Sequence, residues 1–163
     1  MKILGIDPGT RIVGFGLLEC RKRYSVSPRD YRVKDAGVLK ADPKLKALQR
    51  ISVLHQAVYD LLNETNPDIC VIESAFLGAN PQSALKLGQA RGAIISAFGR
   101  KSLPVAEITP TEVKKYVTGS GCSEKKNVAD ALFRLLNFDK GRLPYDVTDA
   151  LAIAFSYPLS VKI

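Results

Sequence analysis

Apolar and polar positions along the first forty residues follow the two-residue period of β-strands. Residues 2–7 (KILGID) form a short apolar run that ends in an acid, and residues 12–19 (IVGFGLLE) form a second run. The glycines of this second run indicate a close approach of another backbone. Residues 31–40 (YRVKDAGVLK) form a third candidate strand. Three consecutive strands with short connections predict an antiparallel meander.

A helical period begins after Pro43. Apolar residues then recur at helical spacing from Leu45 to Leu62, and the pattern ends before Pro67. Residues 68–73 (DICVIE) return to an apolar run and predict a buried strand that also ends in an acid.

The second half of the chain predicts one more strand and four helices. The helices are expected over residues 83–98, 109–117 and 123–136 and from about residue 146 onward, and the strand over residues 104–108. Ser123 is the expected N-cap of the third of these helices. This order of elements predicts an α/β fold, a five-stranded mixed sheet flanked by helices on both faces, in a single domain over residues 1–163.

Length and composition narrow the classes of protein. A chain of 163 residues suits one domain, and no apolar run approaches the roughly 18 residues that span a bilayer. The first ten residues predict a strand and a turn rather than a signal peptide, so we expect a cytoplasmic protein without membrane contact. Three cysteines without metal-ligand spacing indicate neither a disulfide framework nor a zinc site. The one histidine, His55, has no triad partners around it, which leaves acids as candidate catalysts.

The net charge of +8 favours a polyanionic partner, with nucleic acid as the leading candidate and a generally solvated basic surface as the alternative. The basic residues are not spread evenly. Three Lys and Arg pairs, at residues 100–101, 114–115 and 125–126, lie in the third quarter of the chain, and the sequence CRKR occupies an early turn at residues 20–23.

Four acids are candidates for chemistry. Asp7 and Glu73 each end an apolar strand, and functional groups of α/β sheets collect at the carboxyl ends of strands. Asp146 and Asp149 lie three residues apart at the start of the last predicted helix, in the stretch LPYDVTDALAIAF (143–155). Four carboxylates at one point repel one another unless a hard cation such as Mg²⁺ or Mn²⁺ lies between them. The alternative is that the four acids are unrelated, and that the two aspartates cap a helix.

Five stretches of the chain resemble, in order and spacing, the motifs of the RuvC family of Holliday-junction resolvases. They are ILGIDPGTRIVGFGL, CVIESAF, NPQSALKLGQARG, VKKYVTGSGCSEKKNV and DVTDALAIA, and together they run through nearly the whole sequence. The resemblance implies an RNase H-like fold and a homodimer that nicks two opposed strands of four-way junction DNA. It also implies partnership with the branch-migration proteins RuvA and RuvB.

The same resemblance assigns roles to individual residues. The catalytic acids of the family match Asp7, Glu73, Asp146 and Asp149, which would bind two Mg²⁺ ions, with Mn²⁺ as a possible substitute. Its functional lysines match Lys114 and Lys125, and their neighbours Lys115 and Lys126 are further candidates for DNA binding. Phe76 matches an aromatic residue that would wedge into the junction, although a buried loop anchor is the commoner role of a phenylalanine. Helix 83–98 would carry the dimer contact.

Two other classes of function stay open. The sequence GIDPGT also resembles the phosphate loop of actin-like and sugar kinases, although that architecture needs two such domains. A non-catalytic junction-binding module, in which the acids are only structural, is the other alternative.

Overall fold

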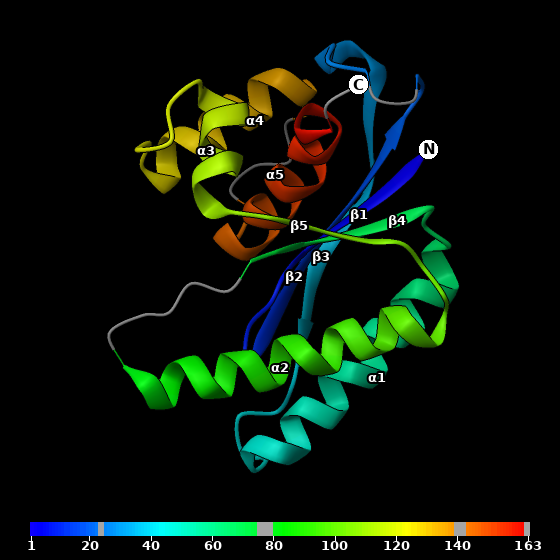
Figure 1. The fold of residues 1–163 in the computed structure, drawn as a ribbon, viewed down its shortest axis with the longest axis vertical. Coiled ribbons are helices and arrows are strands. Elements are labelled where there is room, and N and C mark those ends of the chain that lie inside the picture. The colour runs from blue at the N-terminus through cyan, green and yellow to red at the C-terminus, as the bar shows by residue number, and fades with distance from the viewer. Residues whose placement is uncertain (23–24, 75–79, 139–142, 162–163) are drawn as a thin grey trace.

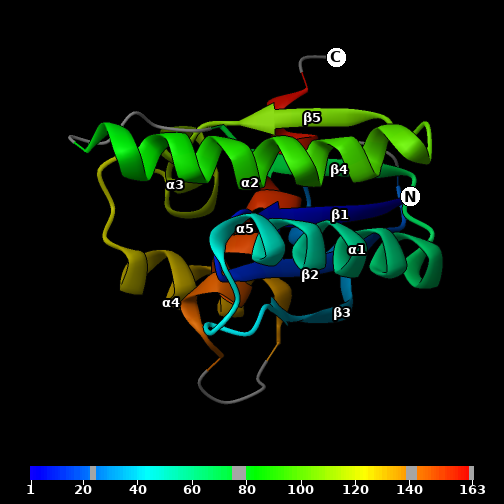
Figure 2. The ribbon, with the colours of Figure 1, turned by 90° about the horizontal axis from the view of Figure 1, so that it is seen from below.

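A five-stranded mixed sheet forms the middle layer of the protein. The computed structural model describes residues 1–22, 25–74, 80–138 and 143–161. The strands are β1 (Lys2–Asp7), β2 (Ile12–Cys20), β3 (Tyr31–Lys40), β4 (Ile69–Glu73) and β5 (Val105–Ile108). Their order in the sheet is β3-β2-β1-β4-β5, as Figure 2 shows. The first three strands form the predicted antiparallel meander, and β4 and β5 run parallel to β1.

Helices cover both faces of this sheet. They are α1 (Ala47–Thr65), α2 (Pro81–Arg100), α3 (Pro110–Thr118), α4 (Lys125–Leu136) and α5 (Tyr145–Ser160), with a short 3₁₀ helix, η1 (Pro28–Asp30), before β3. Helices α1 and α2 lie on one face, and α3, α4 and α5 lie on the other (Figure 1). Because both faces are covered, β1 and β4 are apolar along their whole buried length, as the sequence predicted. None of the helices within the described residues is long and apolar enough to cross a membrane.

Helix α5 lies directly on the backbones of β1 and β2. A Cβ atom added at Gly5 would stand 2.7 Å from the backbone nitrogen of Ala154, and one at Gly14 would overlap the carbonyl oxygen of Asp146. The predicted close approach at the glycines of β2 is therefore confirmed, and α5 is the backbone that approaches. This contact places the start of α5 over the ends of β1 and β2 where Asp7 pairs with Gly14.

The predicted N-cap of α4 is wrong by one residue, whereas the last helix begins within one residue of the predicted start. Helix α4 has Glu124 rather than Ser123 at its N-cap, because the Ser123 hydroxyl is bonded at 2.7 Å to the hydroxyl of Thr118 at the end of α3. Helix α5 begins at Tyr145 with Pro144 as its N-cap residue and no side-chain cap. Asp146 therefore lies inside the first turn and does not cap the helix.

Candidate functional site

Two acids lie side by side at the carboxyl edge of the sheet. Strands β1 and β4 are parallel neighbours in a register that pairs Ile6 with Ile72, so the next residues along the two strands are Asp7 and Glu73. The sequence-based expectation that these strand ends adjoin is confirmed. Both side chains are only partly exposed and point into a common pocket.

A pocket of about 280 Å³ collects these acids with groups from the helical layer above. Asp149, in the second turn of α5, supplies a third carboxylate, and α3 and α4 supply one lysine each. The lining consists of Asp7, Glu73, Pro110, Val113, Lys114, Lys125, Val128 and Asp149. Residues from five elements therefore line one pocket. Its lining contains three acids, two lysines, one proline and two valines.

Lys125 connects α4 to the acids of the pocket. Its ammonium group donates a hydrogen bond to Oδ2 of Asp149 at 2.7 Å, and the Asp149 side chain is only 21% exposed. The interaction with Asp149, first through the hydrogen bond and then through its charge, raises the pKa of Lys125, to which the charges of Asp7 and Glu73 also contribute. Lys125 therefore stays protonated and offsets part of the negative charge around it.

Burial and crowding of like charges perturb the two strand acids. Desolvation raises the pKa of Asp7 to about 7, and the carboxylates of Asp149 and Glu73 add to this effect, while Lys125 opposes it. The pKa of Glu73 is raised for the same reasons, with burial again the larger cause. A carboxylate cluster of this kind is unfavourable when ionised, and a bound cation relieves the repulsion.

The chain is similar to known proteins along nearly its whole length. A protein family described as "Crossover junction endodeoxyribonuclease RuvC" matches residues 3–157. The chain belongs to the RuvC family. A RuvC protein of Thermosipho melanesiensis is 41% identical to it over 99% of both chains, and one of Halothermothrix orenii is 36% identical over the whole of this chain and 95% of the relative.

Solved structures agree with the family assignment. Thermus thermophilus RuvC in complex with a Holliday junction substrate superimposes with a TM-score of 0.85 at 29% identity, covering 96% of this chain and 92% of the other. The yeast mitochondrial resolvase Ydc2 superimposes with a TM-score of 0.64 at 12% identity, over 96% of this chain and 77% of that chain, which supports the shared fold alone. The RNase H-like α/β fold predicted from the sequence is thus confirmed.

Membership of this nuclease family implies the use of a divalent metal ion. Within the described residues, no three acidic, histidine or cysteine side chains stand close enough together to hold one ion as they are placed. The donor chemistry nevertheless fits a hard cation, because the pocket offers carboxylate oxygens without sulfur or imidazole. The raised pKa of Asp7 also fits, because burial and then the charges of Asp149 and Glu73 make its ionised form unfavourable, and a bound cation would stabilise that form.

The remaining candidate residues of the RuvC resemblance lie at different distances from this pocket. Asp146 does not line it, but its charge is close enough to raise the pKa of Asp7, as the smallest of the contributions. Lys115 is exposed outside the pocket, and Lys126 lines a separate hollow between α4 and the start of α5. Phe76 falls in residues 75–79, outside the described part of the chain.

Arg91 is a residue of the site that the sequence-based reasoning missed. From α2, its Nε donates a hydrogen bond of 3.2 Å to the backbone carbonyl of Glu73. Its Nη2 lies 2.8 Å from Oε2 of Glu107 on β5, as an ion pair without hydrogen-bond geometry. Arg91 thus ties α2 to the ends of two strands beside the pocket. The signal in the sequence was a lone arginine among the small residues of GQARG.

Proposed function

We propose that this RuvC-family chain is a structure-selective endonuclease that resolves Holliday junctions in DNA recombination and repair. It nicks two opposed strands in a reaction that needs Mg²⁺, and it leaves 5′-phosphate and 3′-hydroxyl ends. The proposal treats residues 1–163 as one nuclease domain that works in the cytoplasm. The observation that carries it is the pocket in which Asp7, Glu73 and Asp149 meet two lysines, in a chain of this family.

The acids are proposed to hold the metal ions. Asp7, Glu73 and Asp149 would provide oxygen ligands from the pocket, and Asp146 would complete the set from the first turn of α5. We propose two Mg²⁺ ions for each site, with Mn²⁺ able to replace them. When bound, such a pair supplies an activated water and stabilises the leaving oxygen of a phosphodiester.

The two lysines of the pocket are proposed to hold phosphate oxygens. Lys125 is bonded to Asp149, so a cation bound by that carboxylate competes with the lysine for it. Lys125 then becomes available to an anionic phosphate, while Lys114 offers a second positive charge from α3. Positive groups aimed at the scissile phosphate stabilise the charge that develops there during hydrolysis. Lys115 and Lys126 would contribute weaker contacts to neighbouring DNA.

Phe76 is proposed to act on the junction itself. It follows Glu73, the second acid of the site, by three residues in the sequence. An aromatic side chain inserted at the crossover would unstack bases and open the strand for cleavage.

A homodimer would deliver the two symmetric cuts. A four-way junction presents two equivalent strands, and a two-fold dimer presents two equivalent pockets. Helix α2 is the proposed interface, because a Cβ atom at Gly88 or Gly92 would meet open space and Leu85 is 65% exposed. These features leave room for a second helix to approach closely. RuvA and RuvB are the proposed protein partners on the junction.

Incubation with a synthetic four-way junction in Mg²⁺ tests the function. We expect paired nicks near the crossover, no cutting of linear duplex of the same sequence, and product nicks that DNA ligase can seal. Asp7→Asn should abolish cleavage while junction binding stays measurable. Junction binding without cleavage by the wild-type chain would instead support a non-catalytic module.

A further inference from the structure

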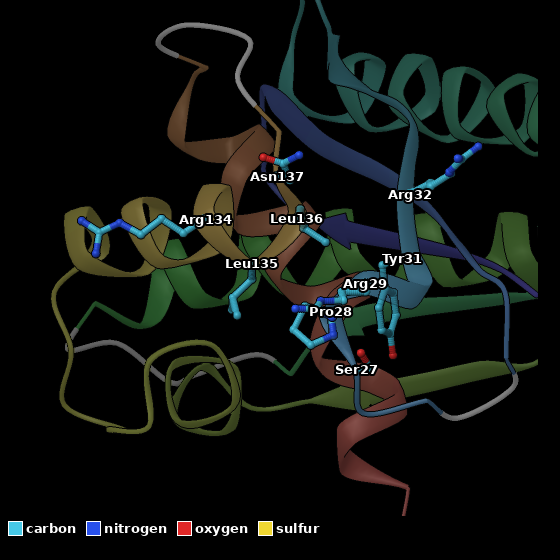
Figure 3. Close-up of a pocket in the computed structure, with 9 residues that line it drawn as sticks. All are labelled: Ser27, Pro28, Arg29, Tyr31, Arg32, Arg134, Leu135, Leu136 and Asn137. Atoms are coloured by element: carbon cyan, nitrogen blue, oxygen red, sulfur yellow. The ribbon is translucent and has the colours of Figure 1, made fainter.

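A basic hollow of the described structure lies away from the pocket of Asp7, Glu73 and Asp149. It is a groove of about 750 Å³ between η1, the start of β3 and the end of α4 (Figure 3). Three arginines line it: Arg29 from η1, Arg32 from β3 and Arg134 from α4. We call this feature the basic groove.

The arginines of the basic groove are exposed and have no carboxylate partner among the described residues. The neighbouring chain enlarges the positive field, because the described residues 20–22 and 25–32 contain four Lys and Arg residues and a single acid. That acid, Asp30, accepts a hydrogen bond of 2.5 Å from the Ser25 hydroxyl rather than pairing with an arginine. Exposed guanidinium groups without a partner are available to phosphate.

The arginines are spread along the groove instead of converging on one point. Arg134 extends from α4 on one side, whereas Arg32 points away from it on the other side (Figure 3). One small anion therefore cannot contact all three. An extended polyanion with regularly spaced charges can, and the backbone of duplex DNA is such a ligand.

The position of the groove fixes which part of the DNA it can reach. The β2–β3 turn lies beside Met1, whereas Asp7 stands at the other end of β1, about 20 Å away at the rise of a strand. Helix α4 bridges the two places, because Lys125 at its first residue lines the catalytic pocket and Arg134 in its last turn lines the groove. At 3.4 Å per base pair, 20 Å corresponds to about six base pairs.

We propose that the basic groove binds the phosphate backbone of one duplex arm of the junction, about six base pairs from the point of cleavage. The inference rests on the proposed function, since it assumes junction DNA in the catalytic pocket. It gives η1, the start of β3 and the end of α4 a role in holding an arm that the pocket itself does not touch.

A double variant, Arg29→Ala with Arg134→Ala, tests the groove, because neither side chain makes a described structural contact. The probe is a four-way junction with 15-base-pair arms, bound in EDTA so that it stays intact. We expect affinity near 0.1 M salt to fall about tenfold and the slope of log K against log salt to flatten by about 2. Lys40→Ala with Lys44→Ala is the matched control. It removes the same charge from exposed positions at the other end of β3 and should change affinity much less.

A second junction locates the contact. Its phosphates five to eight base pairs from the crossover are replaced by neutral methylphosphonates. The methylphosphonates should lower the affinity of the wild type for the junction. They should not lower the affinity of the arginine double variant any further. The proposal would be overturned if the double variant and the methylphosphonates lowered affinity additively. It would also be overturned if the double variant bound the junction as tightly as the lysine control. A wild-type chain that neither prefers nor cuts junctions in Mg²⁺ would refute the proposed function instead, so the two failures are distinguishable.

Discussion

Among the acids that line the pocket, Asp7 has the most strongly raised pKa. It stands between Glu73 on the next strand and Asp149 on α5, and desolvation together with these two charges raises its pKa to about 7. The folded chain therefore holds a proton on Asp7 over a range of pH in which the unfolded chain has lost it.

Asp7→Asn should stabilise the fold at alkaline pH. Between about pH 4 and 7 the folded state binds more protons than the unfolded state, so the free energy of unfolding falls as pH rises through this window. At pH 8 the free energy of unfolding of the variant should exceed that of the wild type by on the order of 2 kcal/mol. This is less than the full pKa shift would give, because solvent screens part of the unfavourable charge.

Urea unfolding at pH 8 and at pH 3.5 measures this effect. The two proteins should converge at the lower pH, where Asp7 is protonated in both states of the wild type. Mg²⁺ should narrow the gap at pH 8 by neutralising the ionised wild-type pocket. If Asp7→Asn were less stable than the wild type at pH 8, burial and the neighbouring carboxylates would not disfavour the ionised form of Asp7.

Lys125→Ala should lower the single-turnover rate of junction cleavage by about 100- to 1,000-fold, the range expected for loss of one group that stabilises developing charge. The change removes the partner of Asp149 and a positive charge from the pocket. Lys126→Ala is the matched control, because it removes the same charge from the next residue of α4, which faces another hollow. Equal losses in both variants would indicate a general effect of charge.

The residues that the sequence located best were those with an unambiguous local pattern. Asp7 and Glu73 were found because each is the sole acid at the end of an apolar strand, and strand ends have a predictable place. The ion pair of Lys125 with Asp149 and the bond from Arg91 to Glu73 were not found. Each joins elements whose relative position depends on packing, which no local pattern encodes.

At the level of elements, α5 decides the geometry of the pocket. It rests on glycines of β1 and β2, and this close contact sets the height at which Asp149 stands above the sheet. The sequence predicted the helix, its start near Asp146 and the close backbone approach, but it placed the N-cap of α4 wrongly at Ser123. The hydrogen bond between the hydroxyls of Ser123 and Thr118 decided that start instead.

Gly5→Ala should destabilise the fold by about 1 to 3 kcal/mol, because its methyl group would collide with the backbone of α5 at Ala150 and Ala154. Gly99→Ala on α2 is the control. A methyl group there meets no neighbouring atom, so the free energy of unfolding should change by less than about 1 kcal/mol. Chemical denaturation compares the two. An unchanged stability of Gly5→Ala would mean that α5 does not lie on β1 as described.

At the level of the whole molecule, one pocket cannot explain two symmetric cuts. The exposed side of α2 is the proposed binding site of a second copy, and Arg91 connects that helix to the carbonyl of Glu73. An interface on α2 would therefore be connected to Glu73, a proposed metal ligand, through the hydrogen bond of Arg91.

Leu85→Asp should convert the proposed dimer into a monomer, because a carboxylate buried at an interface without a partner is strongly unfavourable. Leu48→Asp on α1 is the control, since Leu48 is similarly exposed, at 73% against 65%, but lies outside α2. Sedimentation velocity should report a monomer only for Leu85→Asp. The same variant should yield junctions with a single nick, whereas paired nicks from a monomer would contradict the role of the dimer.

The order of the elements along the chain has a consequence for protein synthesis. Asp7 and Glu73 belong to strands that leave the ribosome early, whereas Asp149 belongs to α5, which follows the other strands and helices of the described residues. A growing chain therefore holds only two of the three pocket acids until α5 is made and packs on the glycines of the sheet. Under the proposed function, a nascent polypeptide that lacks α5 cannot cut chromosomal DNA, and the nuclease becomes competent only after α5 has been translated.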